Sequence, residues 1–386
     1  MARSIQIQVE PSILKYGRYL SGYTIKDASK KLKIPEDKIR KLEEERGSLT
    51  LVQVKKMAEV YKVPMVYFLL QKAPQDAVVP KDFRIVFSSE TDSFSHEVMT
   101  AVRKGRYAQS IIQDLQEEEI KYPFKTVEIT DDPEKVGVYF LSLLSVNPDE
   151  KRKWSNPATA LRGWKDAIER LGIFVLQQSL PKDDISAFCL ADEKPYVVVI
   201  NSAEHENRRI FSLFHELGHI LLHRSGVCTP NNFSRNSYDY IKVEKFCNQF
   251  SASVLVPISD FKSNDIVNKL SRINFENWDL EDIKNLAITF RVSQEVIYRR
   301  LVQIGVLDEK KYERKRNELM KGFQEYKEIK KKSAPIPQYR KIISKNGRAF
   351  TSLVLRSMNE NRITLADVSN FLGTTSKHIS EIEAHI

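Results

Sequence analysis

The spacing of apolar residues predicts that the chain begins as a bundle of short helices. Apolar positions recur with the helical period in five stretches of the first 72 residues, and turn residues separate these stretches. Within 24–45, Thr24 is placed to cap a helix, and a tight turn at 33–35 divides the stretch in two. Two helices joined by such a turn predict a helix-turn-helix unit. The predicted helices are 11–22, the two halves of 24–45, 51–61 and 64–71.

The apolar pattern becomes strand-like after residue 171. Helical patterns at about 93–119, 133–145 and 156–171 precede three runs of β-branched and aromatic residues, at 172–178, 185–191 and 196–201. These runs predict a small antiparallel sheet that leads directly into the next helix. An extended peptide could add to the edge of such a sheet as one more strand.

That next helix, residues 208–224, carries the most informative polar side chains. Because His215 and His219 are four residues apart, their imidazoles lie on one helix face and can bind one Zn²⁺ ion. Glu216 lies beside such an ion, where it can take a proton from water and pass it to a leaving amine. This is the H-E-x-x-H pattern of zinc peptidases. Gly218 predicts a close backbone approach at mid-helix. The expected core-facing residues are Ile210, Phe214, Leu217 and Leu221.

A catalytic zinc site needs a third protein ligand. His223 continues the line of histidines, but it could reach the same ion only if the helix were distorted. Glu244 begins a second amphipathic stretch, 243–257, and a carboxylate beside its apolar stripe is well placed, with Asn248 one turn later to orient it. His205 and Cys228 are the other candidates. A donor that stabilises the transition state is also needed, and the spacing does not select among Tyr238, Tyr240 and His205.

Two stretches resemble known families. FHELGHILLH (214–223), followed by EKFCNQFSASVLVP (244–257), is similar to the ImmA/IrrE family of zinc metallopeptidases, although Phe246, Cys247 and Ser251 replace residues usual in that family. The stretch 14–70 resembles the XRE (Cro/C1-type) DNA-binding domain. The resemblance implies a zincin-like fold with His215, His219 and Glu244 on zinc and Glu216 as base. It also implies cleavage of an XRE-type repressor in stress or mobile-element regulation.

Charge and cysteine content restrict the partners and the cell compartment that we expect for this protein. The formal net charge of +10 is concentrated at the ends, with +7 in 1–72, +7 in 307–386 and −4 between them. Basic ends suit a phosphate backbone, so DNA is an expected partner. Three cysteines without a CxxC spacing argue against a disulfide framework. With no apolar run long enough to span a membrane and no signal-peptide pattern, we expect a cytoplasmic protein without membrane contact.

The N-terminal unit differs from the XRE pattern in the second helix of its helix-turn-helix. The expected DNA-reading residues Lys38, Arg40 and Lys41 are mixed with carboxylates that repel phosphate. The unit therefore either binds DNA or serves as a protein-docking module. These acidic residues are Glu36, Asp37, Glu43 and Glu44.

The C-terminal end repeats part of the N-terminal unit. Residues 364–383 align without a gap on 24–43, with six identities in twenty positions, and Gly373 stands at the turn. A second helix-turn-helix-like unit is therefore expected, with Lys377 on its second helix as a candidate DNA contact. The alternative is that this tail only packs against the peptidase domain.

These inferences give an α+β, mainly helical protein. The expected domains are an XRE-type unit (1–72), a linker (73–84), a zinc metallopeptidase domain (85–306), a basic helical connector (307–333) and a C-terminal unit (334–386). The expected function is a zinc endopeptidase coupled to DNA binding. The alternative is a non-proteolytic or antitoxin-like regulator whose metal domain is a sensor or structural. The sequence does not determine the substrate, the inducing signal or the oligomeric state.

Overall fold

A computed structural model describes residues 5–72, 95–181, 184–223, 227–228, 238–315 and 336–386. The chain divides into two compact units, one comprising 1–107 with 183–185 and the other 108–182 with 186–386. The predicted linker 73–84 lies outside the described residues, as does the connector from 316 onward. Among the helices described, none is long and apolar enough to cross a bilayer. The predicted fold class, α+β and mainly helical, is confirmed.

The first unit is a bundle of short helices with a two-stranded antiparallel sheet that the sequence did not predict. Thr24 and Thr50 each begin a helix with a reciprocal capping box, formed with Asp27 and Gln53. Lys33 adopts a left-handed conformation at the turn between α2 and α3. The elements are β1 (Gln6–Val9), α1 (Pro11–Leu20), α2 (Ile25–Leu32), α3 (Glu36–Glu44), β2 (Gly47–Thr50), α4 (Leu51–Tyr61) and the 3-10 helix η1 (Met65–Leu69).

Helix α6 (His96–Leu115) contributes its residues up to 107 to the first unit. There the ring of His96 stacks on Tyr23 at 4.5 Å, and His96 Nδ1 lies 2.7 Å from the carbonyl oxygen of Ser21. The predicted inward-facing residues of the α2–α3 pair are all buried: Ala28, Leu32, Ile39 and Leu42.

The second unit is built around a four-stranded sheet in the order β3-β5-β4-β6. Its strands are β3 (Phe174–Gln178), β4 (Ala187–Leu190), β5 (Val197–Asn201) and β6 (Val227–Cys228). The prediction of a purely antiparallel sheet was wrong, because β3 and β5 are parallel. The reason is topological. The chain makes a β4–β5 hairpin and returns β5 between β3 and β4, so β5 runs in the direction of β3.

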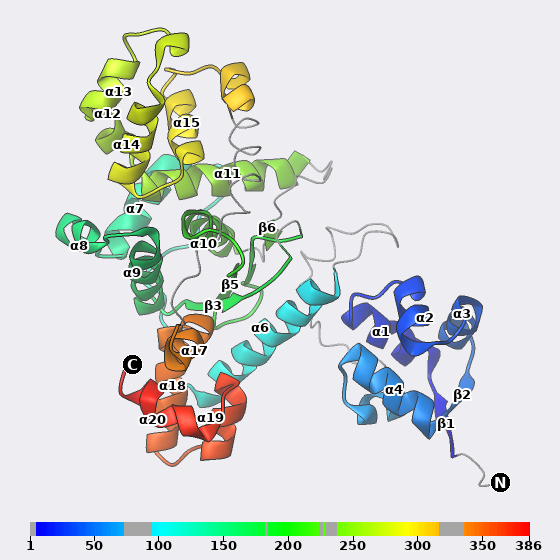
Figure 1. Ribbon diagram of the computed structural model, residues 1–386. Helices are drawn as coiled ribbons and strands as arrows, with labels where there is room; N and C mark the ends of the chain where they lie inside the picture. Colours follow the sequence, from blue (N-terminus) through cyan, green and yellow to red (C-terminus); the bar gives the residue numbers. More distant parts are fainter. Residues whose placement is uncertain (1–4, 73–94, 182–183, 224–226, 229–237, 316–335) are drawn as a thin grey trace. The chain divides into compact units, whose positions relative to one another are not determined.

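Helices precede and follow this sheet along the chain. Before it come α7 (Pro133–Leu143), α8 (Pro148–Lys153) and α9 (Pro157–Arg170); after it come α10 (Glu206–Leu221) and α11 (Tyr238–Leu255). Helix α10 packs between the sheet and α11 (Figure 1), and its four predicted core residues are fully or almost fully buried. A further group of helices follows: α12 (Ile258–Lys262), α13 (Asp265–Leu270), η2 (Phe275–Asn277), α14 (Leu280–Phe290) and α15 (Gln294–Gln303).

The C-terminal bundle, residues 336–386, belongs to the second unit. Its α19 has the bounds of α2 shifted by 340 residues, with the same capping box, here between Thr364 and Asp367. Gly373 is left-handed at the turn, as Lys33 is in the first unit. The sequence repeat is therefore also a structural repeat. The elements are α17 (Gln338–Asn346), α18 (Arg348–Asn359), α19 (Leu365–Leu372), η3 (Ser376–His378) and α20 (Ile379–Glu383).

Candidate metal centre

Three side chains from two helices converge on one point in the second unit. His215 and His219 come from α10 and Glu244 from α11, and their ligand atoms lie within 4.8 Å of one another. The two Nε2 atoms are 3.2 Å apart. The carboxylate oxygens of Glu244 lie 3.3 Å from Nε2 of His215 and 3.4 Å from Nε2 of His219. No other group of three potential ligands is found within the described residues.

The separations of these atoms fit a zinc ion. Zn²⁺ binds histidine nitrogen and carboxylate oxygen at about 2.0–2.1 Å, so the corners of its tetrahedron are roughly 3.3–3.4 Å apart. The separation of 3.2 Å between the two Nε2 atoms is close to that edge length. Each Nε2 also has one oxygen of Glu244 at a similar distance, Oε2 at 3.3 Å from His215 and Oε1 at 3.4 Å from His219. Two imidazole nitrogens that face each other at 3.2 Å also need a proton or a cation between them, because neutral acceptors would repel. These residues could therefore hold the ion.

Burial and charge favour the binding of a cation by His215, His219 and Glu244. His215 and His219 are buried, and the side chain of Glu244 is 22% exposed. Burial alone would raise the pKa of Glu244, but the two imidazoles outweigh it and hold the pKa well below its usual range. Burial alone would lower the pKa of His215, but the carboxylate of Glu244 outweighs it and the pKa is raised. Glu244 thus remains an anionic ligand.

Glu216 lies next to the ligands with its carboxylate fully buried. Apart from the weak thiol donor of Cys189, its two oxygens have no hydrogen-bond partner among the described residues. Burial raises the pKa of Glu216, and the imidazoles of His219 and His215 oppose that rise. A buried carboxylate without strong donors is costly unless a partner binds there. Its position is the one expected of a proton acceptor beside a metal.

Asn248 contacts a different ligand from the one that the sequence suggested. We expected it to orient Glu244, but Nδ1 of His215 donates to Oδ1 of Asn248 at 3.2 Å. This bond keeps the proton of His215 on Nδ1 and leaves Nε2 free to face the ion. The reason is helical phase: Glu244 and Asn248 share one face of α11, and α10 presents His215 to both.

The other candidate ligands have different positions. The ring nitrogens of His223 contact Oγ1 of Thr126 at 2.8 Å and the hydroxyl of Tyr196 at 3.2 Å, and its side chain lines a separate cavity of about 260 Å³. His205 caps the start of α10, where Nδ1 accepts from the backbone of Asn207. The side chains of Cys228, Tyr238 and Tyr240 lie outside the described set.

Sequence reasoning missed Cys189 as a neighbour of Glu216 in the metal centre. Cys189 lies on β4, where it pairs with Val198 of β5 and is fully buried. Burial raises the pKa of Glu216, and the thiol of Cys189 is one of the groups that oppose this rise. Nothing in the local pattern signals this contact, because it depends on how α10 packs on β4.

The candidate DNA contacts are at the surface of their units. Lys38, Arg40 and Lys41 on α3 are exposed, as is Lys377 in η3. Glu43, one of the four acidic residues of this region, points inward. It forms two hydrogen bonds with the guanidinium of Arg18, at 2.7 and 2.8 Å, and its side chain is 6% exposed. The exposed face of α3 therefore carries less negative charge than the sequence of this helix suggests.

Residues 168–302 match the family model of the M78 peptidases, described as the IrrE N-terminal-like domain. The matched stretch contains β3 to β5, α10 and α11, and therefore all three converging ligands and Glu216. The match supports a metallopeptidase-type function for this part of the chain. No curated protein matches the chain.

Proposed function

We propose that this protein is a zinc-dependent endopeptidase coupled to DNA-binding helical units, and that its substrate is an XRE-type transcriptional repressor. The observation that carries the proposal is the converging group of His215, His219 and Glu244, with the buried carboxylate of Glu216 beside it. The match of 168–302 to a peptidase domain supports the same reaction class.

In this proposal the chain's own residues hold the ion and move the proton. His215, His219 and Glu244 would hold zinc, which supplies Lewis acidity toward a peptide carbonyl when bound. Glu216 accepts a proton from the attacking water and delivers it to the leaving amine. Its burial supports this role, because the raised pKa brings the carboxylate closer to working pH. Asn248 holds the ring of His215 in place.

The DNA-binding part of the proposal rests on the two repeated helix pairs. The exposed side chains of Lys38, Arg40 and Lys41 form a basic group on the second helix of the first pair, and Lys377 lies in the corresponding part of the C-terminal bundle. Arg18 neutralises Glu43, which removes one of the charges that would oppose phosphate. A protein that binds a repressor's operator and cleaves that repressor would have both partners at one place.

Two variants of the full-length protein test the peptidase assignment. Glu216→Gln should retain zinc and lose cleavage of the repressor encoded nearest to the gene, by roughly 10²- to 10⁴-fold. Glu244→Ala should lose zinc itself. Metal analysis and mass spectrometry of the repressor after incubation give both readouts. Glu281→Gln on α14 is a matched control, since Glu281 is an exposed partner of Lys284.

The outcomes separate the proposal from its rival. Full zinc occupancy in Glu244→Ala would contradict the ligand assignment. Bound zinc without cleavage under any inducing condition would instead favour a regulator whose metal domain senses a ligand or stabilises the fold. A zinc site closed by a fourth protein ligand would point the same way.

A further inference from the structure

The C-terminal bundle is attached to β3 and α9 by polar contacts at one residue of α17. The carbonyl oxygen of Ser344 accepts from Nε2 of Gln177 on β3 at 2.6 Å and from Nζ of Lys165 on α9 at 3.1 Å. Nε2 of Gln177 also lies 2.8 Å from the Ser344 hydroxyl oxygen. Gln177 and Lys165 are both buried. Both side chains would lose Ser344 as an acceptor if the bundle undocked.

A second attachment lies at the start of α18. One carboxylate oxygen of Glu169, on α9, accepts from the backbone N–H groups of Arg348 and Ala349, each at 3.1 Å. The other accepts from the backbone N–H of Val175 at 3.4 Å. A carboxylate at a helix N-terminus satisfies donors that the helix cannot satisfy itself. Glu169 therefore links α18 to both α9 and β3.

Gly347 makes room for this link. It has a φ of +77°, and a Cβ atom there would collide with Oε1 of Glu169 and lie 2.6 Å from the carbonyl oxygen of Val175. A side chain at position 347 would thus have to displace the carboxylate or the bundle. Gly305 has a similar φ of +75° but no atom within 4 Å of such a Cβ. It provides a control with the same backbone requirement and no contact to disturb.

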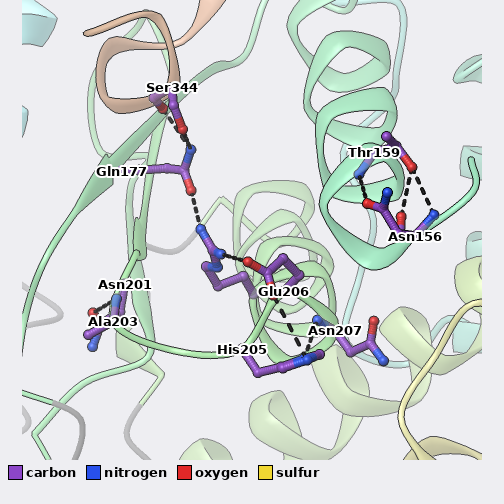
Figure 2. A network of polar contacts seen from close by, with 10 residues as sticks. Asn156, Thr159, Gln177, Asn201, Ala203, His205, Glu206, Asn207 and Ser344 are labelled. Carbon is purple, nitrogen blue, oxygen red and sulfur yellow. Dashed lines mark hydrogen bonds and ion pairs between the residues drawn. The ribbon is translucent and has the colours of Figure 1, made fainter. Parts of the chain in front are cut away.

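The same Gln177 reaches the helix that carries the metal ligands. Its Oε1 accepts from Nη1 of Arg209 at 2.8 Å, and Nη2 of Arg209 lies 2.5 Å from Oε1 of Glu206 in the first turn of α10. Figure 2 shows Ser344, Gln177 and Glu206 along this line of dashed contacts. The amide orientation follows from the chemistry, since a guanidinium only donates and a carbonyl only accepts. These hydrogen bonds form a continuous chain from Ser344 on α17 to Glu206 on α10.

We propose that Gln177 is a positioning residue that couples docking of the C-terminal bundle to the metal-bearing helix α10, with Glu169 as the contact that holds the bundle in place. Release of the bundle removes the acceptor that orients the Gln177 amide. Arg209, at the start of α10, then keeps Glu206 but loses its hydrogen bond to Gln177 on β3. Docking and zinc binding should therefore favour each other, because coupling between two sites is reciprocal. The zinc part of this inference rests on the proposed function.

Gly347→Val in the full-length protein tests whether the bundle is docked as described. Hydrogen–deuterium exchange should become faster, by roughly tenfold or more, for amides of α18 and of the first turns of α10, since local opening controls exchange. Exchange in α4 of the first unit should not change. Gly305→Val should leave α18 and α10 at their wild-type rates. Unchanged exchange at α10 after release of α18 would overturn the coupling.

Variants at Gln177 distinguish its contact with Ser344 from its contact with Arg209. Gln177→Leu removes both contacts, so exchange should become faster in α17 and at the start of α10. Gln177→Glu keeps an acceptor for Arg209 but places a carboxylate against the carbonyl oxygen of Ser344. It should restore protection of α10 while α17 stays less protected. Equal effects of the two variants on α10 would show that Gln177 acts only by filling space.

Added Zn²⁺ provides the readout that a purely structural role would not change. In the wild type, zinc should slow exchange in α17 and α18, whereas in Gln177→Leu this effect should be lost. Zinc affinity in Gln177→Leu should fall by roughly two- to tenfold, less than the 10- to 100-fold expected for a direct partner of a ligand. If zinc does not bind the wild type, the proposed function fails while the exchange results still test the coupling. If zinc binds the wild type but does not slow exchange in α17 and α18, the coupling is contradicted while the proposed zinc site is not.

Discussion

Gly218 of α10 and Cys247 of α11 are in such close contact that a Cβ atom on Gly218 would lie 3.0 Å from Sγ and 3.1 Å from Cα of Cys247. Gly218 immediately precedes the ligand His219, and Cys247 lies three residues after the ligand Glu244. This contact therefore sets the separation of the two helices where their ligand atoms meet. It also gives a physical reason for a glycine in the middle of a buried helix.

Gly218→Ala should weaken zinc binding more than it changes stability. The methyl group needs the helices to separate by a few tenths of an ångström, which moves Glu244 away from the histidines, while alanine gains about 1 kcal/mol in helix propensity. We expect zinc affinity to fall by roughly tenfold, measured by competition with a chelator. Gly17→Ala in α1 is the control, because its Cβ would meet atoms only at 3.5 Å or beyond. Unchanged affinity in Gly218→Ala would mean that the helices can adjust.

Asn248→Leu should lower zinc affinity by roughly 10- to 100-fold, because the acceptor that fixes the ring of His215 is lost. Asn248→Asp retains an oxygen at the same place and should keep most of the affinity. Isothermal titration of the two variants gives the comparison. Equal losses in both would show that the size of the side chain, and not its acceptor, is what matters.

Stability should depend on pH through Glu169. Burial raises the pKa of Glu169 to about 7, although Lys165 and the backbone N–H groups of Ala349 and Val175 oppose the rise and Asp166 adds to it. A carboxyl with a raised pKa in the folded state contributes stability that is complete below its unfolded value of 4.5 and is lost as pH rises through about 7. The difference corresponds to roughly 3 kcal/mol at most.

Glu169→Gln should therefore show a smaller loss of stability than the wild type between pH 5 and pH 8. Urea unfolding of both proteins with a chelator present measures this without a contribution from metal release. The same pH dependence in the two proteins would show that Glu169 does not titrate in this range.

Glu43→Gln should destabilise the first unit instead of improving DNA binding. It leaves the guanidinium of Arg18, whose side chain is 16% exposed, without its carboxylate partner, at a cost on the order of 3 kcal/mol. Glu44→Gln changes an exposed residue and should alter stability by less than about 0.5 kcal/mol. Thermal unfolding and DNA affinity over a salt series test both. A Glu43→Gln variant of wild-type stability would show that the ion pair is dispensable.

The sequence by itself determined the features that depend on neighbours along the chain. Helix positions followed from apolar period and capping residues, as in the capping boxes of Thr24 and Thr364. The four-residue spacing of His215 and His219 placed both rings on one face, and the structure brings their Nε2 atoms together. The repeat of 24–43 at 364–383 also appears in the structure, because caps and turn residues act locally.

Only the tertiary structure decided which distant groups meet. The parallel pairing of β3 with β5, the contact of Asn248 with His215 and the pairing of Glu43 with Arg18 each depend on how elements pack. The docking of α17 through Ser344 had only been one of two alternatives in the sequence. Local patterns carry the period and the caps of an element. They do not determine how the element is rotated about its own axis or which element it packs against. These two properties decide which partners a polar side chain meets.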